Sequence, residues 1–224
     1  MIEFFQFVVY NKINLSQTNS YIKNVFKTIK GYFKVLFLYV LIVVILTSLG
    51  INTSKKSVFN TPNVPEIYKL LMVVIIMPII EEIVFRLSLL PNKKKLYFSL
   101  IFGNILCFFF FRKSFVNEIF HKTFFLTTTF LSLYCLNRFY DKIVAFIFNN
   151  IRLLIHLMVF LFCIMHIPNY IFGKGNTPYL LLLLQILNGY YFSFVRLKYG
   201  FYYAIFIHIF HNFLVSLPLL IKYI

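Results

Sequence analysis

Long apolar runs alternate with short polar stretches along this chain, and many of those stretches contain proline or lysine. A helix needs about 20 predominantly apolar residues to cross a bilayer. We therefore expect spanning helices at residues 33–51, 67–90, 96–111, 119–136, from about 153, 179–195 and 201–223. The pattern predicts an all-α, polytopic transmembrane helical bundle of seven or eight spans.

The stretch 142–172 is long for one helix, and Asn149, Asn150 and Arg152 interrupt it. Polar residues inside an apolar pattern favour a break, so we expect an interfacial helix that leads into a span from Leu153. The domain organisation follows from the short loops. One integral membrane domain is expected over residues 1–224, with a core at 67–223 that carries the motifs and a cytoplasmic or interfacial N-terminal segment at 1–32.

Composition supports a membrane protein. Hydrophobic residues make up 61% of the chain and charged residues only 12%, whereas about a quarter of an ordinary soluble domain is charged. The net charge of +16 is explained by basic residues at the ends of apolar runs, which orient spans and contact lipid, so the bilayer is the expected partner and nucleic acid is not. The lysines before the first run predict a cytoplasmic N-terminus: Lys12, Lys23, Lys27, Lys30 and Lys34.

The cysteines carry no recognisable chemistry. Cys107, Cys135 and Cys163 lie inside apolar stretches, without a spacing typical of a metal site or a disulfide framework. We expect them to be small core residues.

An acidic pair stands inside one apolar run, where Glu81 and Glu82 are followed by Arg86. Ionisable side chains at bilayer depth are costly and face a protein interior or a water-filled cavity. Residues four apart share a helix face, while adjacent residues diverge by about 100°. Arg86 can therefore pair with Glu82, which leaves Glu81 to accept a proton. The alternative is an ion network that only fixes helix packing or marks a transport path.

Two further segments carry polar side chains. His166 lies near the end of the span that begins around Leu153, and Phe162 is one turn before it. The phenylalanine is expected to stack beside the imidazole and help to exclude water. For each residue alone, a satisfied interfacial histidine and ordinary core packing remain the simpler interpretations.

His208 and Asn212 are four apart in the last run and share a face. Both can donate hydrogen bonds, so together they could hold an oxyanion while a peptide carbonyl is attacked, or they could join helices as structural polar contacts. His211 is a second candidate for either role. His121 and His156 lie near the ends of predicted spans and are treated as background.

The three motifs together resemble those of a known family. Glu81-Glu82-x-x-x-Arg86, Phe162-x-x-x-His166 and His208-x-x-x-Asn212, in this order in apolar segments, are similar to the motifs of the CAAX-processing and bacteriocin-processing (CPBP, or Abi) intramembrane proteases, which include type II CAAX prenyl endopeptidase-like proteins. The resemblance implies an all-helical membrane fold around a polar cavity. It also implies the residue roles. Glu81 and His166 would activate water, His208 and Asn212 would stabilise the oxyanion, and Glu82 with Arg86 would form a structural pair.

The cofactor and the length of the middle region are separate questions. Zinc would suit Glu81, His166 and His208, but the chain has no His-Glu-x-x-His pattern, and we favour the metal-free mechanism without a cofactor. The region 87–161 is longer than in compact members of the family. An inserted helix pair there could gate lateral access from lipid.

The function that these residues favour is an intramembrane endopeptidase. Its candidate substrates are a lipidated or prenylated C-terminal tail, a small leader-bearing peptide such as a bacteriocin, and a membrane-bound regulator. One alternative is a noncatalytic immunity or scaffold protein of the same fold, and another is a proton-coupled transporter. A noncatalytic protein has no need of all four candidate catalytic residues, and the sequence lacks the paired broken helices in two matching halves that would favour a transporter.

Overall fold

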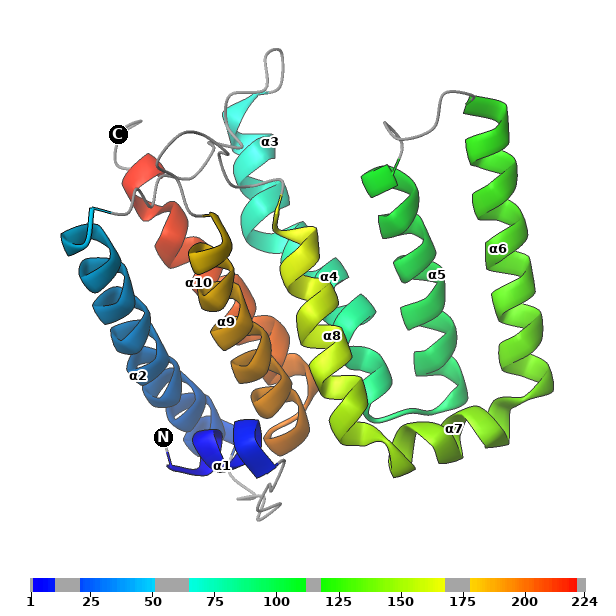
Figure 1. Ribbon diagram of the computed structural model, residues 1–224, viewed down its shortest axis with the longest axis horizontal. Coiled ribbons are helices and arrows are strands. Elements are labelled where there is room, and N and C mark those ends of the chain that lie inside the picture. Colours follow the sequence, from blue (N-terminus) through cyan, green and yellow to red (C-terminus); the bar gives the residue numbers. More distant parts are fainter. Residues whose placement is uncertain (1, 11–20, 51–64, 112–117, 168–177, 221–224) are drawn as a thin grey trace. The chain divides into compact units, whose positions relative to one another are not determined.

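The computed structural model (Figure 1) describes residues 2–10, 21–50, 65–111, 118–167 and 178–220. These ranges contain helices and the turns between them, and no strand, which confirms the all-α prediction. The chain divides into two compact units, Met1–Ile79 with Leu157–Ile224 and Ile80–His156. Each unit is described by itself, and the single domain expected from the sequence stays a prediction.

The first unit is built on α2 (Tyr21–Ser48), α9 (Pro178–Lys198) and α10 (Phe201–Leu220), which pack against one another. α2 begins well before the apolar run predicted at 33–51. The reason is that its first turns are amphipathic, with lysines on one side and the fully buried Thr28 on the other. A search for continuous apolar runs does not detect such turns.

α1 (Ile2–Tyr10) contributes aromatic side chains to the same unit and contacts α9. Phe4 and Phe7 are buried. The ring centroid of Phe4 lies 5.6 Å from that of Tyr191, and the centroid of Phe7 lies 5.6 Å from that of Phe194. The N-terminal segment therefore supplies part of the packed core, which the sequence analysis did not foresee.

A tight turn joins α9 to α10. The carbonyl of Val195 accepts hydrogen bonds from the backbone N–H groups of Tyr199 at 2.8 Å and Gly200 at 3.2 Å. Gly200 has a φ of +117°, a conformation that residues with a Cβ rarely adopt. The glycine thus ends one helix and allows the next to begin at once.

The predicted span at 67–90 is helical but not uniform. It consists of α3 (Glu66–Leu71), the π-helical turn η2 (Met72–Ile76), α4 (Met77–Arg86) and the 3₁₀ turn η3 (Leu87–Leu89). Pro78 explains the irregularity, because proline has no backbone N–H and its ring crowds the carbonyl four residues earlier. A wider turn just before the proline relieves this conflict.

The second unit contains α5 (Lys93–Phe111) and α6 (Glu118–Arg138), which lie side by side, followed by α7 (Tyr140–Asn149) (Figure 1). Leu96, Leu136 and Ile147 form its buried core. The unit covers most of the region 87–161, which the sequence marks as unusually long. This region therefore has a hydrophobic core of its own.

The predicted break near Asn149 and Asn150 is confirmed. α7 and α8 (Ile151–Met165) meet there at an angle of 90°. Asn150 closes α7, since its backbone N–H and its side-chain amide both donate to the carbonyl of Phe146 at 2.9 Å. The interfacial position of α7 stays a prediction.

One described helix, over Tyr21–Ile45, is long and apolar enough to cross a membrane, with a mean hydropathy of 2.0. α7 and α8 would supply a second such segment if the bent pair counts as one span. The observed α5, α6, α9 and α10 agree closely with four of the predicted runs. The total of seven or eight spans stays a prediction.

Candidate active site

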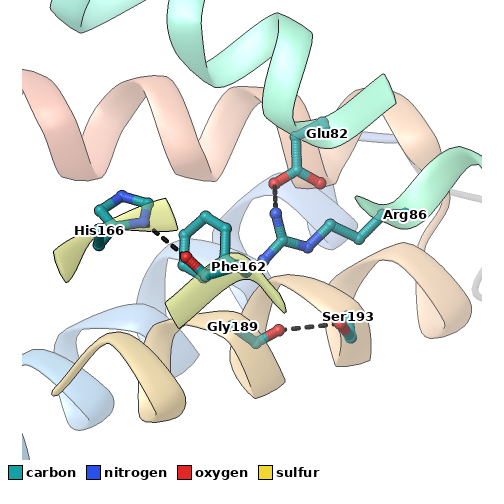
Figure 2. Close-up of polar contacts among 6 residues, drawn as sticks. All are labelled: Glu82, Arg86, Phe162, His166, Gly189 and Ser193. Carbon is teal, nitrogen blue, oxygen red and sulfur yellow. Dashed lines mark hydrogen bonds and ion pairs between the residues drawn. The ribbon is translucent and has the colours of Figure 1, made fainter. Parts of the chain in front are cut away.

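The ion pair predicted from the four-residue spacing is present in α4. Arg86 Nη1 donates to Glu82 Oε1 at 2.9 Å (Figure 2). Both side chains are buried, with exposed fractions of 1% for Arg86 and 0% for Glu82. Two charges removed from water in this way require each other. Glu81 is half-buried on the same helix.

His166 directly follows the last residue of α8, and its imidazole bonds back to that helix. Nδ1 of His166 lies 2.8 Å from the carbonyl oxygen of Phe162 (Figure 2). A carbonyl can only accept, so Nδ1 carries the hydrogen, and in the neutral ring the lone pair is then on Nε2. The last carbonyls of a helix lack partners within the helix. This bond therefore satisfies one of them and fixes the tautomer of His166 at the same time.

Phe162 contacts two motif histidines. Its ring centroid is 4.4 Å from that of His166 and 6.0 Å from that of His208. Phe162 itself is buried, with 1% of its surface exposed. Phe162 lies beside His166 as predicted, but the two rings are tilted by 50° rather than stacked, and the same ring also contacts His208 of α10.

His208 is enclosed by aromatic rings. It is 2% exposed and stacks on Phe192 of α9, with ring centroids 4.4 Å apart and planes inclined by 23°. Phe162 contacts it edge-on at 73°. These contacts restrict the orientation of the imidazole and exclude water from it.

A glycine allows α8 and α9 to approach closely beside Phe162. A Cβ added to Gly189 would lie 3.1 Å from Val159 Cγ1 and 3.4 Å from Phe162 Cδ1. The carbonyl of Gly189 also accepts a hydrogen bond from Ser193 Oγ at 2.8 Å (Figure 2). Gly189 therefore makes room for the ring that touches both histidines.

Asn212 links α10 to the π-helical turn. Its Nδ2 donates to the carbonyl oxygen of Val73 at 2.9 Å, in the turn that precedes Pro78. A side-chain donor is well placed there, since a widened turn disturbs the regular backbone hydrogen bonds. This bond is a polar contact between helical segments, which was the structural alternative considered for Asn212. Its oxyanion role stays a prediction.

His211 contacts two residues that the sequence did not single out, Tyr32 and Asn188. Tyr32 Oη lies 2.7 Å from His211 Nδ1, and Asn188 Nδ2 lies 3.4 Å from His211 Nε2. All three side chains are buried. His211 thus joins α2, α9 and α10, which is the structural one of the two roles considered. The sequence signal for Asn188 was a polar residue inside an apolar run.

Comparison with known proteins decides the family. Residues 63–214 match the model of the family described as Type II CAAX prenyl endopeptidase Rce1-like. The chain belongs to this family. The match spans all three motifs, and members of the family are integral membrane proteins. No curated protein and no solved structure matches the chain.

Membership of the Rce1-like family supports a CAAX-type intramembrane protease. Within the first unit, the structure brings together Phe162, His166 and His208. Glu81, with the pair Glu82 and Arg86, belongs to the second unit. The convergence of Glu81 with the histidines around a polar cavity stays a prediction.

The remaining candidates are packing residues or carry no assigned chemistry. His121 is buried and stacks on Phe108, with ring centroids 4.5 Å apart. Cys107 and Cys135 are half-buried, and Cys163 is buried with its Sγ 4.0 Å from the carbonyl oxygen of Leu182. Among the described residues, no three His, Cys, Asp or Glu side chains are grouped so that they could hold a metal ion.

Proposed function

We propose that this chain is an intramembrane endopeptidase that hydrolyses a peptide bond in a prenylated, membrane-associated protein. The family match supports both the reaction class and this kind of substrate. The observation that carries the proposal is the contact of one buried ring, Phe162, with both His166 and His208. These two histidines come from separate motifs and share one aromatic neighbour, and His208 is buried from water.

In the proposed mechanism, Glu81 and His166 activate a water molecule. Nε2 of His166 is the basic nitrogen, because Nδ1 is committed to the carbonyl of Phe162. As the water loses a proton to this pair, its oxygen bonds to the carbonyl carbon of the substrate and the carbonyl electrons move onto the oxygen. His208 and Asn212 donate hydrogen bonds to this oxyanion. Collapse of the intermediate breaks the C–N bond, and the leaving amine takes up the proton.

The contact of Asn212 with Val73 is compatible with this role. A carboxamide has two N–H donors, so one can bond to the Val73 carbonyl while the other faces the oxyanion. The first bond would then orient the second donor. The proposed mechanism has no step through a metal ion, and the family assignment does not choose between the metal-free and the metal-dependent type.

The test compares purified variants in liposomes with a farnesylated peptide, the products being identified by mass spectrometry. We expect Glu81→Ala and His166→Ala each to lower the cleavage rate by at least about 10²-fold, the usual contribution of a general base. Matched controls are Glu118→Ala, which removes an exposed carboxylate, and His156→Ala, for which no role is proposed. Both controls should cleave at the rate of the unaltered chain.

Two further conditions sharpen the test. The same peptide without the prenyl group should be cleaved poorly if the lipid is part of recognition. A chelator should leave the rate unchanged if the reaction needs no metal. Equal rates for the unaltered chain, Glu81→Ala and His166→Ala would refute the proposed roles.

A noncatalytic binding protein of the same fold is the second candidate, and one observation favours it. Asn212 and His211 both make bonds between helices, so these two residues have structural value without any reaction. Such a protein would bind the farnesylated peptide without cleaving it, and Glu81→Ala would leave the binding intact.

A further inference from the structure

A basic pocket lies among α1, α2 and α9 in the first unit, in a region that the proposed proteolysis does not use. Its volume is about 300 Å³, at the lower end of the range for pockets that bind small ligands. The lining residues that matter for its chemistry are four lysines, one glutamate and one tyrosine: Lys27, Lys30, Lys34, Lys198, Glu3 and Tyr199.

The charges of this pocket are unbalanced. Lys198 is buried and its Nζ pairs with Oε2 of Glu3, which is the one carboxylate among the described lining residues. Lys27, Lys30 and Lys34 are exposed on α2. Their spacing of three and four residues places them on one face of the helix. The pocket therefore presents an excess of positive charge to an anion.

A neutral donor stands at the same pocket. Tyr199 lies in the turn between α9 and α10, and burial, together with the nearby Glu3 carboxylate, raises the pKa of its phenol. The phenol therefore keeps its proton at neutral pH. It can donate a hydrogen bond to an anionic group without adding a negative charge.

An apolar groove adjoins the basic pocket and shares Lys30 and Lys34 with it. This groove is shallow and open, and it runs along α2 beside Phe26, Phe33 and Phe37. The three rings are well exposed, at 68%, 49% and 70% respectively. Exposed aromatic side chains in a row indicate contact with an apolar partner.

We propose that the pocket and the groove together bind one anionic phospholipid, with its phosphate among the lysines and an acyl chain along the phenylalanines. The two sites share two lysines, so a single molecule with a charged head and an apolar tail can occupy both. The same helix contains the candidate span Tyr21–Ile45, whose lysine-rich end is where lipid phosphates are expected. A soluble phosphate would use the pocket but would leave the groove empty.

The test measures lipid retained by the full chain after purification in detergent, by native mass spectrometry with phosphatidylglycerol and phosphatidylcholine added in equal amounts. We expect phosphatidylglycerol to be retained preferentially. The combined substitution Lys27→Gln, Lys30→Gln and Lys34→Gln should reduce its retention by at least about tenfold, because each lysine near an anionic lipid surface contributes about fivefold. Retention of phosphatidylcholine should not change.

The matched control is Lys93→Gln, Lys94→Gln and Lys95→Gln, which removes the same charge from the start of α5, where Lys93 and Lys94 are exposed and Lys95 is half-buried. This control should keep its phosphatidylglycerol. Equal losses in the two triple variants would overturn the proposal, because the effect would then come from net charge alone.

Two competitors and one set of substitutions identify the occupant. Inorganic phosphate should not displace the lipid, and Phe26→Ala with Phe33→Ala and Phe37→Ala should weaken retention of the long-chain lipid. Displacement by inorganic phosphate, or retention that is indifferent to the three rings, would indicate a soluble anion instead. Displacement by a farnesylated peptide with a free carboxylate would assign the pocket to substrate and overturn the lipid proposal. The inference is independent of the proposed proteolysis, so either can fail alone.

Discussion

Phe162 is the residue through which the two motif histidines are connected, and its position depends on the missing side chain of Gly189. Replacing the glycine by alanine places a methyl group 3.1 Å from Val159 Cγ1 and 3.4 Å from Phe162 Cδ1. Space of this kind in a core is filled to van der Waals contact. The methyl group therefore displaces one of the two side chains.

We expect Gly189→Ala to lower stability by about 1–3 kcal/mol, as overpacking does, because the methyl group crowds Val159. A shift that Val159 passes on to Phe162 should also lower the rate of peptide cleavage. Thermal unfolding in detergent and the liposome assay measure the two effects. Gly103→Ala is the control, because its Cβ would meet only Val84 Cγ1 at 3.8 Å. Adding Val159→Ala to Gly189→Ala should restore stability and the cleavage rate, because the crowded side chain is then shortened. If it does not, the steric explanation is wrong.

The buried pair of Glu82 and Arg86 leads to a second prediction. Arg86→Met leaves a buried carboxylate without its cation, so we expect a loss of about 3–5 kcal/mol in the free energy of unfolding. The double variant Glu82→Gln with Arg86→Met should recover most of this loss, since both charges are then absent. Chemical denaturation of the unaltered chain and the two variants tests this. An unchanged stability of Arg86→Met would mean that the pair has no structural role.

Single residues also show what sequence reasoning can reach. The Glu82–Arg86 pair and the contact of Phe162 with His166 are local, four residues apart, so helix geometry predicts them. The bond from Tyr32 to His211 joins residues 179 positions apart, and no local spacing encodes such a contact. The contact of His208 with Phe192 is likewise set by how two helices pack.

At the level of elements, the apolar pattern predicted most helices and the break between α7 and α8. It placed the start of α2 too late and missed α1 as a packed helix, because both begin with amphipathic rather than continuously apolar turns. It also gave no sign that the helix bearing the glutamates contains a π-helical turn. That feature depends on Pro78 and on the partner that Asn212 finds in Val73.

The bond from Asn212 to Val73 carries a third prediction. Asn212→Leu should lower stability by about 1–3 kcal/mol, since the Val73 carbonyl loses its donor. Asn104→Leu is the comparison, because Asn104 Nδ2 bonds only within its own helix, to the carbonyl of Leu100 at 2.9 Å, and its loss should cost less. Thermal shift assays compare the two. Equal losses of stability would show that the bond from Asn212 to Val73 contributes no more than a bond within one helix.

For the whole molecule, the main prediction concerns orientation in the membrane. Basic residues accumulate on the cytoplasmic side of spans, and lysines are concentrated at the N-terminal end of Tyr21–Ile45. With the native cysteines replaced by serine, Lys23→Cys should react with an impermeant maleimide only in inside-out vesicles. Leu49→Cys, an exposed position just beyond the opposite end of the helix, should react only in right-side-out vesicles. Labelling of both variants from the same side would show that the first helix does not cross.

The π-helical turn at Met72–Ile76 has one more consequence. An α-helix bonds each N–H to the carbonyl four residues earlier, whereas a π-helical turn uses the carbonyl five residues earlier and so holds one extra residue. A chain shortened by one residue in this turn would therefore close it as a regular α-helix and leave the glutamates on the same face. Two homologues with identical motifs and a one-residue difference in length here would then differ in the carbonyl offered to Asn212 rather than in the direction of their glutamates.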